Sequence, residues 1–220
     1  MSSLYVTCSR DIINADIDLG VGIKNIESEQ YHIGLLYKQE EAPPRLLHLA
    51  WHHDLKDVEL PSDYFIGLSD LDRFNKMYMV SLASRVANFP QEIPYSIVFD
   101  GDTYFDDTGK YLPISAGTGL TCATFVLALF ENSGFKLVNF STWSNRTDDV
   151  IWQRKIIQTL RDKGGSSDHI EALEKNIGAS RLRPEEACAA VISKIHPIDF
   201  KMAKKMAADI IKDLSKIRTR

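Results

Sequence analysis

The pattern of apolar and polar positions divides the chain into a mixed first part and a helical last part. Short runs rich in β-forming residues occur up to about residue 144, separated by segments with proline, glycine and acidic residues. From residue 145 onward, apolar residues recur at helical spacing and predict helices over 149–163, 168–176, 184–194 and 199–217. We therefore expect an α+β fold with a core in residues 1–144 and a helical C-terminal segment in residues 145–220.

Two neighbouring β-rich runs, 31–38 and 45–52, predict an antiparallel hairpin joined by a polar turn that ends in two prolines. The first run carries His32, and the second carries His48 in its middle and His52 at its end. Side chains alternate between the two faces of a strand, so the register decides whether His32 and His48 share a face. The sequence leaves that register open.

A third segment, 119–135, predicts a helix with a cysteine in its first turn. Thr121 suits the N-cap, because its hydroxyl can accept a hydrogen bond from a free backbone N–H. Cys122 would then lie at the positive end of the helix dipole, which favours the thiolate and predicts a lowered thiol pKa. A buried face is indicated by Phe125, Val126, Leu129 and Phe130.

Several other elements follow from local patterns. A helix is predicted to open at a capping box over 69–72 and to run to about Asn88. Strands are predicted over 4–7, 95–99 and 135–138, with a short return strand at 103–105. Residues 10–29 contain two glycines and suggest an irregular segment, and 61–68 suggest a connector. The apolar stripe expected on the helix consists of Leu71, Phe74, Met77, Tyr78, Leu82 and Val86.

The order of these motifs resembles that of circularly permuted papain-like cysteine hydrolases, including the permuted NlpC-type and lecithin:retinol acyltransferase-like families. Those families carry a histidine followed by glycine, aliphatic residues and tyrosine on one strand, a second histidine on the next strand, and later a cysteine that opens a helix. Thr121 stands where those families usually have Asn or Asp. The matching runs span about residues 30–135 and are His32-Ile33-Gly34-Leu35-Leu36-Tyr37, Leu46-Leu47-His48-Leu49 and Thr121-Cys122-Ala123-Thr124-Phe125-Val126.

This resemblance implies a permuted papain-like core whose antiparallel sheet packs on the cysteine-bearing helix. It implies that Cys122 is the nucleophile, that His32 is the general base, and that His48 orients His32. The backbone N–H of Cys122 would help to stabilise an oxyanion. The expected activity is cleavage or transfer at an amide or ester bond through a thioester, on a peptide, acyl or lipid-type substrate in a cleft, without a cofactor or metal. The alternative is an inactive papain-like module that binds a peptide or lipid.

Other arrangements of the same residue types fit the sequence less well. His48, His52 and His53 suggest a metal site, but a strand would separate His48 and His52 by about 13 Å. A histidine after the cysteine, as in unpermuted papain, would have to be His169 or His196, and neither lies on a predicted strand. The acidic residues Asp100, Asp102, Asp106 and Asp107 lack the spacing of a calcium loop, although Asp100 is a reserve candidate for the third catalytic member.

Composition limits the classes of partner and the cellular location that we expect. A formal net charge of -4 argues against a specific nucleic-acid role, and no apolar run is long enough for a transmembrane segment. Three widely spaced cysteines do not suggest a disulfide framework, so we expect a cytoplasmic protein or one exported without a cleavable signal peptide. The last predicted helix is amphipathic with a basic face, which suggests a protein partner as an alternative to a merely solvated surface.

Overall fold

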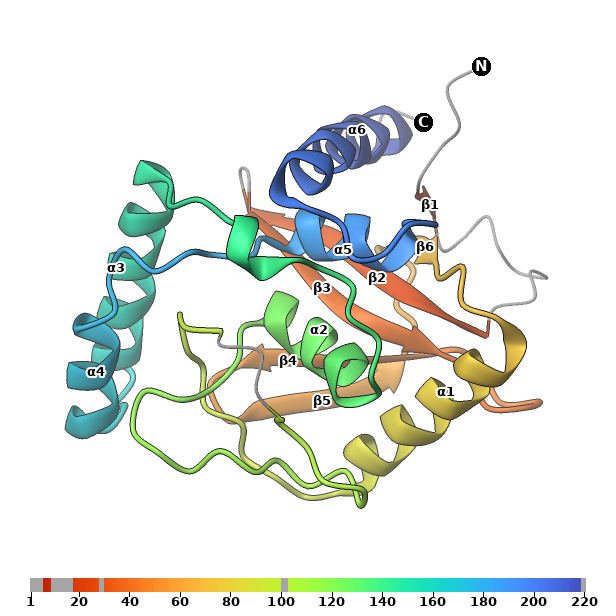
Figure 1. Ribbon diagram of the computed structural model, residues 1–220. Helices are drawn as coiled ribbons and strands as arrows, with labels where there is room; N and C mark the ends of the chain where they lie inside the picture. The colour runs from red at the N-terminus through yellow and green to blue at the C-terminus, as the bar shows by residue number, and fades with distance from the viewer. Residues whose placement is uncertain (1–5, 9–17, 28–29, 100–102, 219–220) are drawn as a thin grey trace.

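The computed structural model describes residues 6–8, 18–27, 30–99 and 103–218. Its centre is a six-stranded antiparallel sheet in the order β1-β6-β2-β3-β4-β5, accompanied by six α-helices in the described part (Figure 1). The expected α+β class is therefore confirmed. The strands are β1 (Thr7–Cys8), β2 (Leu19–Glu27), β3 (Gln30–Tyr37), β4 (Arg45–Trp51), β5 (Asp54–Glu59) and β6 (Phe65–Leu68). The helices are α1 (Arg73–Asn88), α2 (Cys122–Asn132), α3 (Thr147–Asp162), α4 (Ser167–Glu174), α5 (Pro184–Ile192) and α6 (Phe200–Arg218).

The predicted hairpin is confirmed as β3 and β4, and its register answers the question that the sequence left open. Leu36 lies opposite Leu46 in the antiparallel pair. Two residues further along the same register, a Cβ added to Gly34 would lie 2.7 Å from the Cβ of His48. His48 therefore projects from the same face of the sheet as Gly34 and His32.

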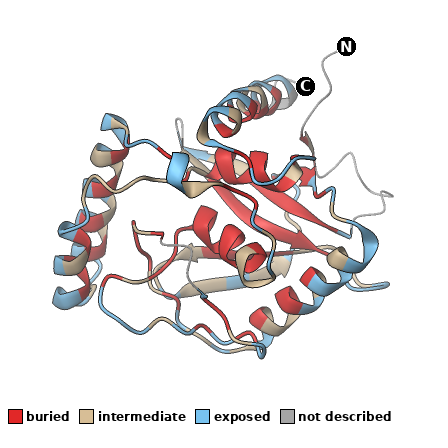
Figure 2. Ribbon diagram, in the orientation of Figure 1, coloured by how far each residue is buried: buried red, intermediate tan, exposed pale blue. Residues whose placement is uncertain are grey.

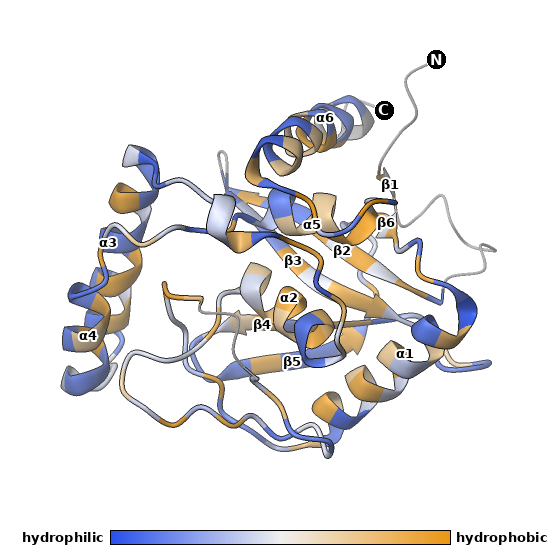
Figure 3. Cartoon of the chain, viewed as in Figure 1, coloured by the Kyte–Doolittle hydropathy of each residue, from blue (hydrophilic) through white to orange (hydrophobic). Residues whose placement is uncertain are grey.

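The opposite face of β2, β3 and β4 builds the main core with the helices. Helix α2 contacts β3 and β4 and is buried along nearly its whole length (Figure 2). Helix α5 contacts β2, β3 and β6, and α6 packs on α5. Hydrophilic residues line the outward sides of α3, α4 and α6 (Figure 3). The contacts of α2 with β3 and β4 fix the N-terminus of α2 against the sheet. The strand residues in this core include Leu19, Val21, Ile23, Ile33, Leu35, Leu47 and Leu49.

Three strands are missing from the sequence prediction. Strand β2 lies in the segment predicted as irregular, β6 lies in the predicted connector, and β5 follows the hairpin directly. The glycines that suggested a loop in β2 are required by close packing instead. A Cβ on Gly20 would collide with the carbonyl oxygen of Gly67 in the neighbouring β6.

The predicted strand over 95–99 is wrong, and 103–105 and 135–138 contribute only isolated bridges, Phe105 to Tyr111 and Val138 to Ile198. The segment after Pro94 instead exchanges single backbone hydrogen bonds with the loop before α2. The N–H of Ser96 donates to the Leu120 carbonyl, and the N–H of Leu120 donates to the Pro94 carbonyl. Of the predicted N-terminal strand over 4–7, Val6 and Thr7 fall within the described residues, and Thr7 belongs to β1.

Helix α1 differs from its prediction at the start and along its apolar face. It begins at Arg73 rather than at the proposed capping box, because Asp72 is the N-cap and accepts from the Asn75 N–H. Phe74 is 80% exposed, and Met77 and Tyr78 are exposed as well. The buried face consists of Met79, Leu82, Ala83 and Val86, so Leu82 and Val86 are confirmed members of the predicted stripe.

The four predicted C-terminal helices are confirmed as α3 to α6, with ends that differ by at most two residues. Helices α3 and α4 contact each other at one side of the molecule, whereas α5 packs on the sheet itself (Figure 1). The division at residue 144 stays a prediction.

Candidate functional site

The two predicted histidines form a hydrogen-bonded pair. Nε2 of His32 lies 2.7 Å from Nδ1 of His48, and the rings meet edge to face with centroids 4.8 Å apart. Each residue is 9% exposed. Because His48 occupies Nε2 of His32, the nitrogen left for any other partner of that ring is Nδ1.

Cys122 is the first residue of α2, next to the start of β3. Thr121 is the N-cap, as predicted, and its hydroxyl accepts from the Thr124 N–H at 3.1 Å. The Thr124 hydroxyl in return accepts from the Thr121 N–H at 2.7 Å, which completes a reciprocal capping box. The backbone N–H of Ile33 also acts on the Cys122 sulfur. The sulfur is therefore held at the backbone of the residue that follows His32.

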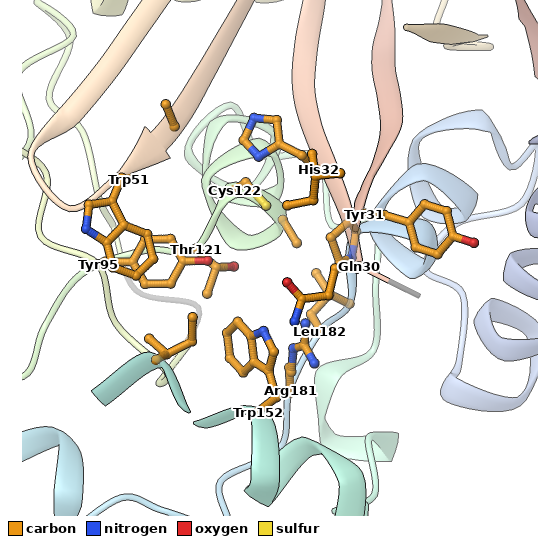
Figure 4. A pocket seen from close by; sticks show the side chains of 15 residues that line it. Gln30, Tyr31, His32, Trp51, Tyr95, Thr121, Cys122, Trp152, Arg181 and Leu182 are labelled. Atoms are coloured by element: carbon orange, nitrogen blue, oxygen red, sulfur yellow. The ribbon is translucent and has the colours of Figure 1, made fainter. Parts of the chain in front are cut away.

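One pocket contains both the sulfur and the His32 ring. It has a volume of about 110 Å³ and is lined by residues from β3, β4, the start of α2, α3 and the loop before α5. In Figure 4, one ring nitrogen of His32 is directed toward the Cys122 sulfur and the other points away from it. Since Nε2 is bonded to His48, the nitrogen directed toward the sulfur is Nδ1. The structure thus places Cys122 and His32 in one pocket and pairs His32 with His48, while no hydrogen bond joins the His32 ring to the Cys122 sulfur among the described residues.

Burial keeps both histidines neutral. Desolvation, with smaller contributions from the His48 ring and the Lys24 charge, lowers the pKa of His32 to about 3. Desolvation is also the largest cause that lowers the pKa of His48 to about 4, followed by the Lys56 ammonium on the neighbouring strand. A neutral imidazole has one free lone pair, so a neutral His32 can accept a proton.

The predicted lowering of the Cys122 pKa is wrong. Burial raises the pKa of the thiol above its usual value, because desolvation outweighs the groups that favour the thiolate. Those groups are the backbone N–H of Ile33, the Arg181 guanidinium and the N–H groups of Ala123 and Cys122. The N–H groups at the start of α2 lower the thiol pKa, as predicted. Burial raises it more, because Cys122 is only 7% exposed. At neutral pH the resting site holds a thiol beside a neutral imidazole.

The alternative histidines have other partners. Nδ1 of His169 accepts from the Gly117 N–H at 3.1 Å, and its Nε2 lies 2.9 Å from the Tyr95 carbonyl. His52 accepts from the Tyr95 N–H through Nδ1 and stacks on His53. His196 is exposed between α5 and α6. His169 and His52 thus hold the loops that border the pocket rather than the sulfur.

The histidines and acidic residues that suggested a metal or calcium site are not gathered into one in the described chain. Within its ranges, no group of three or more His, Cys, Asp or Glu side chains is placed to hold a metal ion. Asp100 and Asp102, and with them the reserve third member, lie outside the described residues. Asp106 accepts from the N–H groups of Thr108 and Lys110 and so closes its own turn.

The sequence analysis missed the residues that wall the pocket. Trp51 stacks at a tilt on Tyr95 with centroids 4.8 Å apart, and the Arg181 guanidinium lies 3.5 Å from the Trp152 ring centroid. Trp152 and Arg181 come from the C-terminal segment, which lies beyond the residues that carry the resemblance. No short motif marks them, because their role depends on where α3 and the loop before α5 are placed.

Comparisons of the chain with protein-family models, curated proteins and solved structures give no match. None of the helices in the described ranges combines the length and the apolar character needed to cross a bilayer.

Proposed function

We propose that this chain is a cysteine-nucleophile hydrolase or acyltransferase with a permuted papain-like core, acting on an amide or ester bond through a thioester. One observation carries the proposal: His48 binds Nε2 of His32, which leaves Nδ1 free, and His32 lines the same pocket as Cys122. A nucleophile, a base and a group that orients the base are the three parts that acyl transfer by a thiol requires.

The first step is attack by sulfur on the substrate carbonyl carbon. Nδ1 of His32 takes the thiol proton as the carbon–sulfur bond forms. For this step the His32 tautomer carries its proton on Nε2 and donates it to Nδ1 of His48, which accepts. His48 thereby fixes the ring orientation and shares the positive charge that appears on His32.

The negative charge that develops on the carbonyl oxygen needs donors near the sulfur. The N–H groups of Cys122 and Ala123 belong to the first turn of α2 and have no helical acceptor. They supply that stabilisation. When the intermediate collapses, His32 returns the proton to the leaving nitrogen or oxygen and the thioester remains. Water or an acceptor nucleophile then attacks the thioester, with His32 again as the base.

The raised thiol pKa and the lowered imidazole pKa suit a site that ionises only with substrate present. The buried ion pair is unfavourable at rest, since desolvation disfavours both charges. A bound carbonyl changes this balance, because the proton transfer is then coupled to formation of the carbon–sulfur bond. The resting thiol is also less exposed to oxidation than a free thiolate would be.

Alkylation with iodoacetamide, followed by peptide mapping, tests the proposal. We expect Cys122 to react faster than Cys188 near pH 7.5, because Cys188 is fully buried in α5 and does not line the pocket. His32→Ala should slow labelling of Cys122 by about tenfold or more and leave Cys188 unchanged. Cys122→Ala should abolish turnover of small esters while the melting temperature changes little.

The same variants separate the enzyme from the inactive binding module. A binding module predicts that Cys122→Ser and His32→Ala retain ligand binding and biological effect. Cys122 that stays unlabelled from pH 6 to 8 in the folded protein would contradict the hydrolase proposal.

A further inference from the structure

Arg181 is a charged residue in the wall of the Cys122 pocket that the mechanism above does not use. It lies between α4 and α5, and its side chain is 15% exposed. Its guanidinium packs flat on Trp152 and lines the pocket together with Cys122 and His32 (Figure 4). A largely desolvated cation in a binding pocket is stabilised when an anion pairs with it.

The carboxylate that anchors Arg181 is shared. Asp149 of α3 is buried, and it pairs with Arg146, Arg181 and Arg183. The Asp149–Arg181 distance is 3.2 Å, longer than the 2.9 Å to Arg183. A single negative charge is therefore divided among three guanidinium groups.

Two of these arginines have a second carboxylate, and Arg181 does not. Arg146 also pairs with Glu186, and Arg183 also pairs with Asp148. Within the described ranges, Asp149 is the one carboxylate that forms an ion pair with Arg181. Glu185 is close enough to act on Arg181, but burial raises its pKa and favours its neutral form. Arg181 is thus the least neutralised of the three.

The donors of Arg181 are also incompletely used. Nη1 donates to Asp149, while Nε and Nη2 have no hydrogen-bond acceptor in the part of the chain that the structure describes. Figure 4 shows the guanidinium on the opposite side of the pocket from the His32 ring, with Trp152 beside it. A planar fork with free donors matches the geometry of a carboxylate.

We propose that the acyl group accepted by this site carries a carboxylate, which Arg181 binds while the scissile carbonyl lies at the Cys122 sulfur. This inference rests on the proposed function and adds its substrate class. The pocket has a volume of about 110 Å³, which suits a short acyl chain. Such a chain would place its terminal carboxylate at Arg181 and its carbonyl at Cys122. The aromatic side chains of Trp51, Tyr95 and Trp152 enclose that chain and exclude water from the ion pair.

Two alkylating reagents of nearly equal size test the proposal: iodoacetate, which carries a carboxylate, and iodoacetamide, which does not. In both reactions the Cys122 sulfur displaces iodide and loses its proton. The measured quantity is the ratio of the two rates at Cys122, divided by the same ratio for free glutathione. We expect this normalised ratio to exceed 1 by about 10- to 100-fold, the range of a charge-assisted hydrogen bond.

Arg181→Gln should return the normalised ratio to about 1. The ratio is the readout, and not either rate alone, because the Arg181 guanidinium also favours the Cys122 thiolate and its loss slows both reagents. Arg183→Gln is the matched control, because it removes another arginine from Asp149 that does not line the pocket. It should keep the ratio of the unmodified chain. Arg181→Lys keeps the charge and should retain an intermediate ratio, which guards against a folding defect in Arg181→Gln.

A binding measurement keeps this proposal separate from the proposed function. In Cys122→Ala, propionate should quench tryptophan fluorescence from the pocket at concentrations at least tenfold lower than propionamide, and Arg181→Gln should remove the difference. If iodoacetamide fails to label Cys122 but propionate still binds through Arg181, the hydrolase proposal is wrong and the carboxylate site stands. Equal affinities for propionate and propionamide, or binding of inorganic phosphate in preference to propionate, would overturn the carboxylate proposal.

Discussion

Gly34 is the residue that allows the two histidines to meet. It faces His48 across the β3–β4 pair, and a Cβ at this position would approach the His48 Cβ to 2.7 Å. That distance is shorter than any normal carbon–carbon contact, so one of the two strands would have to shift. The hydrogen bond between His32 and His48 depends on the space that glycine leaves.

Gly34→Ala should therefore disable the site more than it destabilises the fold. We expect kcat/KM to fall at least tenfold, because His48 moves away from His32 and no longer orients it. The free energy of unfolding should fall by about 1–3 kcal/mol, the usual effect of overpacking. Ester turnover and urea unfolding measure the two quantities.

Gly22→Ala provides the control for this substitution. Gly22 pairs with Gly34 across β2 and β3, and its added Cβ would meet the Leu46 side chain at 2.8 Å instead of a histidine. We expect a comparable loss of stability with retained turnover. Equal loss of turnover in both variants would mean that the sheet, and not the histidine pair, responds to the added methyl group.

The lowered histidine pKa values predict that acid destabilises the fold. The unfolded chain binds protons at His32 and His48 below about pH 6.5, whereas the folded chain does so only near pH 3 and pH 4. The unfolded state therefore binds more protons between these limits. Stability is fully present above pH 6.5 and falls as the pH is lowered, by up to about 2 kcal/mol per histidine at pH 5.

Urea unfolding of the unmodified chain and of His32→Gln/His48→Gln, at pH 7 and pH 5, tests this linkage. The double variant should lose less stability between the two pH values. His196→Gln removes an exposed histidine and is the control. An equal pH dependence in the unmodified chain and the double variant would contradict the assignment of these two groups as buried and neutral.

The three candidate catalytic residues were identifiable from the sequence because each lies in a short local motif. Their ionisation was not, since the expected thiolate at Cys122 depends on how deeply α2 is buried. The position of Arg181 in the pocket could not be predicted either. Its placement depends on the contact between α3 and the loop before α5, which no local pattern encodes.

Helix α2 is the element that positions the nucleophile, and its first turn depends on the reciprocal cap of Thr121 and Thr124. Thr121→Ala should lower the free energy of unfolding by about 1 kcal/mol, because the Thr124 N–H loses its acceptor. Thr121→Ser and Thr121→Asn should stay within about 0.5 kcal/mol, since both side chains can accept the same hydrogen bond.

Thermal unfolding and alkylation of Cys122 can be measured on the same three variants. The Cys122 labelling rate should change only in Thr121→Ala, where the first turn frays. A labelling rate that changes equally in all three variants would indicate that the threonine methyl group, and not the cap, matters here.

The elements that the sequence predicted correctly have strong, uninterrupted patterns, namely the β3–β4 hairpin, α2 and the four C-terminal helices. The failures have physical causes of two kinds. Residues 95–99 are rich in β-formers but have no neighbouring strand, because the chain there bonds to the loop before α2. In α1 the apolar residues spread over more than one face, so helical spacing alone could not show that Leu82 and Val86 are covered while Phe74 is exposed.

At the scale of the whole molecule, the C-terminal segment is part of the environment of the site. Residues 187–191 of α5 are buried against the sheet, and Trp152 and Arg181 complete the pocket around Cys122. The same segment holds the arginine cluster around Asp149. These contacts bear on the predicted division at residue 144, because a core that ends there would expose the apolar face of β2 and β3.

A chain that ends at residue 144 should therefore fail to unfold cooperatively in urea, since it lacks the α5 side chains that cover β2, β3 and β6. A chain that ends at residue 199 lacks only α6, which packs mainly on α5, and is the control. We expect it to unfold cooperatively at a lower urea concentration and to keep Cys122 more reactive than Cys188 toward iodoacetamide. A cooperative transition in the 144-residue chain would instead establish the first segment as an independent domain. Arg181 and Trp152 would then belong to a separate unit that closes over a preformed cysteine–histidine pair.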